Sequence, residues 1–184
     1  MAVDMFINLG TSIKGESKDR TQGPKGDCDV LAWSWGMSQS GSFHTGGGGG
    51  AGKANIQDIS FTKWVDKATP ALMTHLTKGT HIPEVILLVR KAGGKQETYI
   101  KFNLKKCIIT SLSTGGSGGE DRLTENVSIN FAEVKFEYFL QDHTGAVASG
   151  GGPGVPGIAE MDSPRDPDCG KARRGCTAIA LRQA

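Results

Sequence analysis

The chain has 184 residues and a formal net charge of +2, a length that fits one domain or one domain with a tail. It contains no basic cluster long enough to indicate nucleic-acid binding and no apolar run long enough to insert into a membrane. The N-terminal stretch has Asp4 where a signal peptide would be basic, so we expect the chain to be cytoplasmic when made.

The N-terminal part predicts two strands around a polar loop. Residues 3–9 read as a strand, residues 11–27 are rich in turn formers, and residues 29–38 alternate between large and small side chains. We expect the large face to enter a core. It holds Leu31, Trp33 and Trp35. The small and nearly featureless face holds Val30, Ala32, Ser34 and Gly36.

A glycine-rich segment follows at residues 39–53, and its composition cannot pack a core. Residues 54–65 alternate again, with Ile59, Phe61 and Lys63 on one side of the predicted strand. Strand, glycine-rich loop and strand together predict an extended hairpin arm. Such an arm is suited to reaching a neighbouring subunit and pairing its strand edges there.

The next part of the chain predicts one helix and several strands. Residues 69–78 form the best helix pattern, with Pro70 in the first turn. Strands are expected at 84–92, 98–114 and 126–140. About eight strands and one helix indicate a mainly β fold, either a barrel or a sandwich.

From about residue 144 the chain becomes rich in Gly and Pro and then loses any clear hydrophobic period. We therefore divide it into a β-barrel domain at 1–143 and a linker with an atypical, flexible tail at 144–184.

Two segments are similar to reactive sites, but both have a simpler interpretation. Residues 47–54 match most of a phosphate-binding loop, yet Ala54 replaces the Ser or Thr that holds Mg²⁺ and a strand pattern follows where a helix is needed. Residues 113–125 gather acidic side chains beside Arg122 without a nucleophile and base to accompany them, which indicates a charged loop. The acidic residues are Glu120, Asp121 and Glu125. We therefore expect no catalytic residue, no enzymatic activity and no cofactor.

The histidines, cysteines and tryptophans also favour structural roles. No two histidines have the HxxxH spacing, and none of the 4 cysteines forms a CxxC pair, so no metal site is expected. The cysteines are predicted to be small buried residues, although Cys169 and Cys176 are close enough in sequence to bridge. Because no basic patch flanks them, the tryptophans are expected in the core rather than on bases or sugars.

Several long segments within about residues 1–140 carry a resemblance to a known family. They are MAVDMFINLG, GESKD, DVLAWSWGMSQSGS, GGGGGAGK, DISFTKWVDKATPALM, VRKAGG and STGGSGGEDRLTENVSINFAEV. In these segments the chain resembles the Hcp (haemolysin co-regulated protein) family, the tube protein of bacterial type VI secretion systems.

The resemblance implies a small two-sheet β-barrel with one α-helix at its side. It also implies homohexameric rings that stack into a conduit inside a contractile sheath, with a VgrG-type spike at the tip and small effectors as cargo in the channel. The family leaves the cell through the type VI system without a cleaved signal peptide. Neither nucleic-acid binding nor membrane insertion is implied.

By position, the resemblance places the small face of the strand at 29–38 on the channel wall, which agrees with its alternation. The wall residues are Ser34, Ala32 and Gly36. The arm at 39–53 would contact the adjacent subunit or ring. The contact residues expected there are Ser42, Phe43, His44, Gly46, Gly47, Gly48, Gly49 and Gly50.

The tail departs from the family pattern. Family members usually end in a short strand with a Gly-Trp-Asp/Asn-Ile-like motif, and this chain has GVPGIAEMDSPRDPDCGKARRGC in its place. If that strand is missing, we expect an open barrel edge and a loss of stability. Two alternatives stay open: a carrier fused to a small C-terminal extension, and a monomeric ligand-binding β-barrel that uses its tryptophans.

Overall fold

The computed structural model describes residues 3–42, 50–91, 96–116, 118–119, 121–139 and 157–162. The strands are β1 (Val3–Asn8), β2 (Cys28–Ser34), β3 (Met37–Ser42), β4 (Gly50–Ile56), β5 (Ile59–Trp64), β6 (Ile82–Lys91), β7 (Thr98–Gly115), β8 (Thr124–Asn130), β9 (Glu133–Tyr138) and β10 (Gly157–Asp162). One α-helix, α1 (Thr69–Lys78), and one short 3-10 helix, η1 (Gly23–Lys25), complete the described elements. The predicted mainly β fold with one helix is confirmed.

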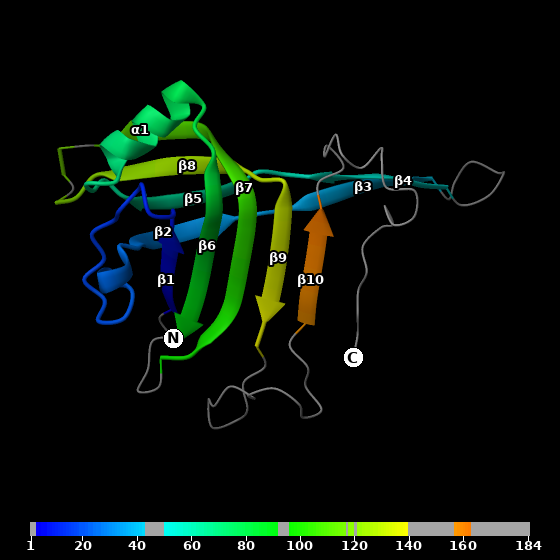
Figure 1. The fold of residues 1–184 in the computed structure, drawn as a ribbon, viewed down its shortest axis with the longest axis horizontal. Helices are drawn as coiled ribbons and strands as arrows, with labels where there is room; N and C mark the ends of the chain where they lie inside the picture. The colour runs from blue at the N-terminus through cyan, green and yellow to red at the C-terminus, as the bar shows by residue number, and fades with distance from the viewer. Residues whose placement is uncertain are drawn as a thin grey trace.

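Six strands close into a barrel in the order β6, β1, β2, β5, β8 and β7. Closure depends on the long strand β7, because its first part pairs with β6 and its second part pairs with β8, both antiparallel. Figure 1 shows that β6 and the first part of β7 cross the direction of β5 and β8, so the barrel has two layers. This confirms the predicted two-sheet barrel.

The interior of the barrel is filled by apolar side chains from both layers. In β5, alternate residues are buried, as a half-buried strand requires. Fully burying one Leu, Ile or Phe side chain stabilises the fold by about 1.5–3 kcal/mol. The inward residues include Ile7, Ile59, Phe61, Leu87, Phe102, Leu104, Val127 and Ile129. Because side chains fill the interior of so small a barrel, a binding surface of this fold has to lie on the outside of the barrel.

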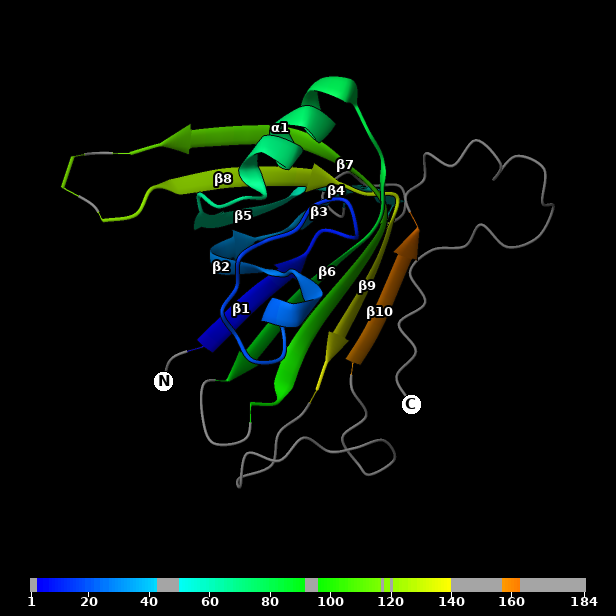
Figure 2. The same cartoon turned by 60° about the vertical axis from the view of Figure 1, so that its left-hand side comes forward.

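Helix α1 begins and ends where the sequence predicted. Pro70 occupies the first turn, and Gly79 ends the helix with a φ of 62°, a left-handed conformation that favours glycine. Leu72 is fully buried and joins the barrel core. Figure 2 shows the helix lying across the end of the layer that contains β5, β8 and the second part of β7.

The tail differs from expectation at one place. Gly157–Asp162 forms β10, which pairs antiparallel with β9, so that Gly157 lies opposite Tyr138 and Asp162 opposite Glu133. Since the barrel closes through β7 and β8, strands β9 and β10 extend the sheet beyond the closed barrel, and closure does not depend on the last strand. Residues 140–156 and 163–184 lie outside the described residues, and the division of the chain at 143 stays a prediction.

Three strands that the sequence predicted as continuous are each divided. The strand expected at 126–140 becomes β8 and β9. The strand expected at 29–38 becomes β2 and β3, and the strand expected at 54–65 becomes β4 and β5. The breaks in these last two strands face each other, because the Gln57 N–H donates a hydrogen bond to the Gly36 carbonyl at 3.0 Å. Beyond the breaks, β3 and β4 form a two-stranded sheet that projects away from the barrel as an arm (Figure 1).

The predicted faces of β2 need one correction. The pairing of β2 with β5 shifts between Val30 and Ala32, which is a β-bulge. A bulge changes the side on which the following residues lie. Val30 is therefore in the core at 5% exposure, and Leu31 is 38% exposed, the reverse of the expected arrangement.

Candidate functional site

Trp33 and Trp35 point toward the core and thereby fix which side of β2 faces outward. Their ring centroids lie 5.1 and 5.6 Å from that of Phe102, in edge-to-face packing. Trp35 also donates its indole N–H to the Gln57 carbonyl at 3.0 Å. Trp33 and Trp35 thus have the predicted core role, and the opposite side of the strand is left for contacts outside the barrel. For Trp64 the prediction is wrong, because it is half-buried beneath Arg122 and does not pack against the core.

Two of the three predicted wall residues lie on that opposite side of β2, and the third, Gly36, follows the end of the strand. Ala32 and Ser34 are exposed, whereas Gly36 is half-buried at the start of the arm. A side chain at Gly36 would meet the Gln57 amide oxygen at 3.1 Å. The channel position of these residues stays a prediction, but the exposed face on which it depends is present.

Neighbouring strands continue this face with hydroxyl and amide side chains. One row crosses β2, β5, β8 and β7 as Ser34, Ser60, Ser128 and Ser111. The next row crosses the same strands as Ala32, Thr62, Asn126 and Ser113. We call the residues of these two rows the hydroxyl face. Within it, the Ser60 and Ser128 hydroxyls are 2.9 Å apart, and the Thr62 hydroxyl donates to Asn126 Oδ1 at 2.6 Å.

Sequence reasoning found only the β2 part of the hydroxyl face. Each of the other strands carries its own alternation of polar and apolar residues, which was a usable signal. What the pattern could not supply is the register, which puts Ser60 beside both Ser34 and Ser128. At the edge of this face, the Asp58 carboxylate accepts hydrogen bonds from Thr110 and Asn130, each at 2.6 Å.

The arm is a ribbon of antiparallel strands. Met37 lies opposite Ile56, Gln39 opposite Ala54, and Ser42 opposite Gly50 at its far end. Of the predicted contact residues, Ser42 and Gly50 bound the described part of the arm. The others, Phe43, His44, Gly46, Gly47, Gly48 and Gly49, lie outside the described residues. The segment similar to a phosphate-binding loop continues into strand β4 rather than into a helix.

A buried ion cluster ties the helix to the barrel. Lys63 Nζ lies 2.6 Å from Asp66 Oδ1 and 2.7 Å from Glu125 Oε1, and the Lys63 side chain is fully buried. The Thr69 hydroxyl at the start of α1 donates to the same Glu125 oxygen at 3.0 Å. Burial lowers the pKa of Lys63, but the hydrogen bonds that its ammonium group donates to Asp66 and Glu125 outweigh this effect, and the net pKa is raised. Lys63 therefore stays charged.

The acidic run at 113–125 is thus not one charged loop. Glu125 belongs to β8 and is buried as part of the ion cluster, whereas Asp121 is exposed. The Arg122 guanidinium lies over the Trp64 ring, 4.8 Å from its centroid. Glu120 lies outside the described residues. Of the two acidic side chains described there, Glu125 is thus in the core and Asp121 is at the surface.

A second buried cation fixes the loop at 11–27 against the outside of β1 and β6. Arg90 is 3% exposed, pairs with Asp19, and donates to the Thr21 hydroxyl at 3.0 Å. Its guanidinium also lies 4.6 Å from the centroid of the Phe6 ring. The Arg90 guanidinium holds the pKa of the Asp19 carboxyl well below its usual range.

The cysteines in the described part of the chain are buried, and His75 makes hydrogen-bond contacts that hold it in place. Cys28 and Cys107 are buried free thiols, as predicted, and burial raises the pKa of Cys107 to about 12. The His75 Nδ1 atom lies 2.8 Å from the Ala71 carbonyl oxygen, and its Nε2 atom lies 3.2 Å from the Ser12 hydroxyl oxygen. Within the described ranges, no group of His, Cys, Asp and Glu is arranged to hold a metal ion. The helices described here include none that is long and apolar enough to cross a membrane.

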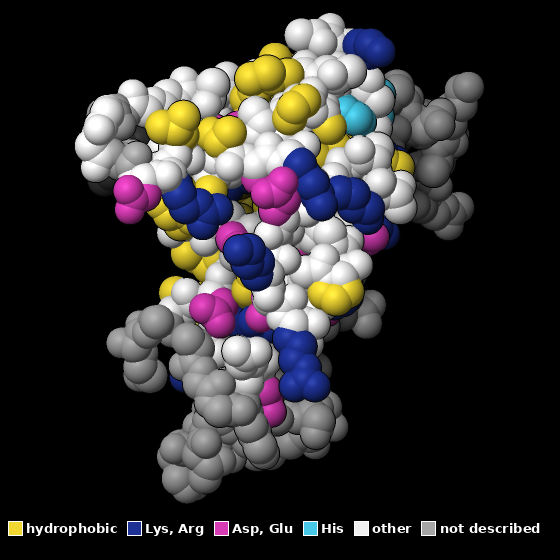
Figure 3. All heavy atoms as spheres, turned by 90° about the vertical axis from the view of Figure 1, so that its left-hand side faces the viewer, with side chains coloured by type: hydrophobic (Ala, Val, Ile, Leu, Met, Phe, Trp, Pro, Cys, Tyr) yellow, Lys and Arg dark blue, Asp and Glu magenta, His cyan; other side chains and the backbone are white. Residues whose placement is uncertain are grey.

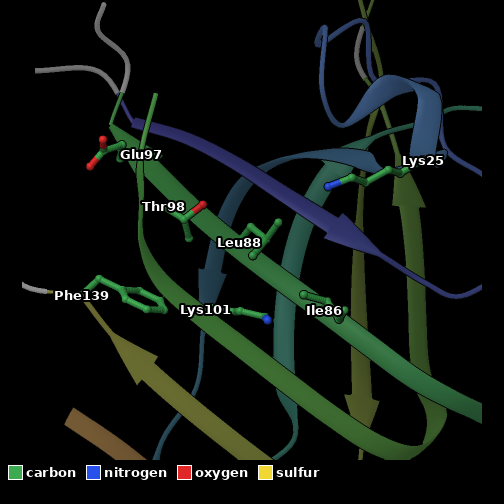
Figure 4. Close-up of a pocket in the computed structure, with 7 residues that line it drawn as sticks. All are labelled: Lys25, Ile86, Leu88, Glu97, Thr98, Lys101 and Phe139. Atoms are coloured by element: carbon green, nitrogen blue, oxygen red, sulfur yellow. The ribbon is translucent and has the colours of Figure 1, made fainter. Parts of the chain in front are cut away.

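A hollow of about 490 Å³ lies on the outer side of β6 and β7. Ile86 and Leu88 of β6 form its floor, and Phe139 borders it just after β9 (Figure 4). Lys25 reaches over it from η1, and Lys101 borders it from β7. Glu97 and Thr98 complete the lining. This hollow was not predicted, because its residues come together only through the pairing of β6 with β7 and the position of the loop at 11–27.

Comparisons with known proteins agree with this architecture. The model of the family described as "Type VI secretion system effector, Hcp" matches residues 6–138. Protein hcp1 of Pseudomonas aeruginosa is 58% identical over 151 residues, which are 82% of this chain and 91% of that protein.

Solved structures extend the agreement to three dimensions. A type VI secretion system effector from Yersinia pestis has 28% identity and a TM-score of 0.67, covering 86% of this chain and 99% of its own. Hcp1 from Salmonella typhimurium has 29% identity and a TM-score of 0.65, covering 88% and 95%. The closed barrel with its projecting arm is thus that of a type VI secretion protein. The chain belongs to the Hcp family, as its sequence predicted.

Proposed function

We propose that the chain is the structural subunit of a type VI secretion tube, forming hexameric rings that stack into a conduit and carry small effectors in the channel. The hydroxyl face is the observation that carries this proposal. It is a continuous sheet surface of Ser, Thr, Asn and Ala side chains without a charged group among them. Hydrogen bonds to such groups contribute only about 0.5–1.5 kcal/mol each, so cargo can be held and still released.

The arm supports the assembly part of the proposal. A strand ribbon that leaves its own barrel exposes backbone groups that can pair with another chain. Met37, at the base of the arm, is 47% exposed and offers apolar surface beside it. The arm would therefore contact the adjacent subunit or the next ring. The proposed contact residues are Ser42, Phe43, His44, Gly46, Gly47, Gly48, Gly49 and Gly50.

The remaining partners follow from the family. The stacked rings would lie inside a contractile sheath and carry a VgrG-type spike at the tip. The subunit would be made in the cytoplasm and leave through the type VI system without a cleaved signal peptide. The role is structural, so no catalytic step is assigned to any residue.

Size-exclusion chromatography with light scattering tests the assembly. We expect a mass close to that of six chains, and negative-stain images of rings with an open centre. A strict monomer at high protein concentration would contradict the proposal and favour a monomeric ligand-binding barrel. The filled barrel interior speaks against that second candidate, because Trp33 and Trp35 are engaged with Phe102.

A bulky polar replacement on the hydroxyl face tests the cargo role. Ser34→Gln should lower the amount of effector that copurifies with the rings by several fold, because the longer side chain covers the hydroxyl rows. The ring mass should not change, since Ser34 is exposed. Thr77→Gln, an exposed change on α1, is the matched control and should retain cargo. Equal cargo recovery with both variants would remove Ser34 from the cargo surface.

A further inference from the structure

We propose that the hollow on the outer side of β6 and β7 is the docking site for an acidic, apolar-bearing segment of the protein that encloses the ring. Because this partner is the contractile sheath of the proposed function, the inference rests on that function and deepens it.

The floor of the hollow is an apolar surface in an unusual place. Val85 and Leu87 of β6 are fully buried in the barrel, so the alternate residues Ile86 and Leu88 point to the outside. Both are half-buried, and Leu88 lies directly opposite Lys101 in the pairing with β7. Phe139 is held beside them, because its N–H donates to the Tyr99 carbonyl at 2.8 Å. These side chains form a recess that fits an apolar side chain of a partner.

The border of the recess carries two cations, Lys25 and Lys101, and one carboxylate, Glu97, and so has a net positive charge. Figure 4 shows Lys25 and Lys101 on different sides of the apolar floor. The loop that carries Lys25 also exposes three cations, Lys14, Lys18 and Arg20, beside one carboxylate, Glu16. Its Asp19 is paired with Arg90. Figure 3 shows Lys and Arg side chains interspersed with Asp and Glu side chains across the middle of the neighbouring face.

Lys101 already has an ion pair, but this pair leaves it able to attract a carboxylate of a partner. It lies 3.8 Å from Glu137, a carboxylate that also lies 3.3 Å from Lys135. One carboxylate therefore serves two lysines, and the Lys101 side chain is 35% exposed. Carboxylates that flank an apolar side chain complement this surface, since opposite charges steer association and fix orientation.

The position of the hollow indicates which partner supplies that segment. The hydroxyl face is the outer side of one barrel layer, built from β2, β5, β8 and the second part of β7. The hollow is on the outer side of the other layer, built from β6 and the first part of β7. The outer sides of two packed layers point away from each other, as Figures 1 and 2 show. If the hydroxyl face lines the channel, the hollow faces away from the axis, where an enclosing partner lies.

A fluorescence-anisotropy titration of purified rings tests the chemistry of the hollow. The test peptide is a labelled amphipathic peptide of Leu and Glu, and its counterpart replaces each Glu with Lys. We expect wild-type rings to prefer the Glu peptide. The double variant K25E/K101E should bind it at least fivefold more weakly and should prefer the Lys peptide. Leu88→Ser should weaken binding without reversing the charge preference. The exposed pair K67E/K78E is the matched control and should behave as wild type.

The source of the segment is tested by assembling sheath subunits of the same secretion system around the tube. Sheaths formed with wild-type or K67E/K78E protein should contain a tube, and sheaths formed with K25E/K101E should be empty. Equal peptide binding by wild type, K25E/K101E and L88S would overturn the docking site. A changed ring mass in K25E/K101E would overturn docking of the sheath at the hollow, and would show that the hollow instead contacts a second copy of this chain. If wild-type protein is monomeric, the proposed function fails separately, and peptide binding to the monomer still decides the chemistry of the hollow.

Discussion

Lys63 is the residue whose environment departs most from what its type prefers. Its side chain is fully buried and its charge is balanced by Asp66 and Glu125. Removing one member of such a group leaves the others buried without their partner, which costs about 3–5 kcal/mol. We therefore expect Lys63→Met to lower the free energy of unfolding by about that amount, although Met fills a similar volume. Urea denaturation followed by circular dichroism measures it.

The neighbouring lysine provides the control for this prediction. Lys67 is exposed, and Lys67→Met should change the free energy of unfolding by no more than about 0.5 kcal/mol. If Lys63→Met were as stable as Lys67→Met, the ion cluster would contribute nothing net, and its place in the core would need another explanation.

At the residue scale, the sequence predicted on which face of a strand a side chain lies. It did not predict which residue, distant in the chain, that side chain contacts. The alternation of residues 54–65 put Lys63 on the same side as Ile59 and Phe61, which is where it lies. Its partner Glu125 is distant in the chain and is brought near only by the pairing of β5 with β8. Leu31 was misplaced for a related reason, since the bulge in β2 depends on the partner strand.

The arm is the element with the clearest separable role. Gln39 and Ala54 lie opposite each other in its ladder, so a two-residue Asn-Gly turn can replace residues 40–53 and close the hairpin early. We expect the shortened chain to retain the barrel, because β3 and β4 pair with each other and not with barrel strands. Ring stacking, or ring formation itself, should be lost.

Two measurements on the shortened chain check this prediction. The thermal midpoint by circular dichroism should stay within a few degrees of wild type, and light scattering should show a smaller assembly. A control that exchanges Lys78 for Ala on α1 should change neither. Rings that still stack without residues 40–53 would show that the arm is not a contact element.

At the element scale, the sequence identified nearly every strand but merged some neighbours. Both ends of the helix at 69–78 were predicted correctly, because Pro70 marks its first turn and Gly79 its end within the local sequence. The division of β2 from β3 has no such signal, since it arises where the arm leaves the barrel and Gln57 bonds to Gly36. The strand at 157–162 was missed because the tail shows no clear hydrophobic period, and this strand forms by pairing with β9.

At the scale of the whole molecule, closure of the barrel does not depend on the strands that lengthen its sheet. Strand β7 belongs to both layers, so the barrel closes before β9 and β10 are added. The sequence could not indicate this, because one strand of 18 residues pairs with three others. The family resemblance supplied the barrel, whereas only the pairing shows which strands are essential for it.

This separation leads to a prediction about the tail. A chain ending at His143 lacks β10 and should still fold cooperatively, because the closed barrel is complete without it. It should be less stable by a few kcal/mol, since the lost cross-strand pairs with β9 are worth about 0.2–1 kcal/mol each. The exposed β9 edge should also make it more prone to associate. A chain ending at Asp162 keeps β10 and should unfold close to the full chain. Urea unfolding and amide hydrogen exchange of β9 distinguish the two, and loss of cooperative unfolding in the shorter chain would show that residues 1–143 are not an independent barrel domain.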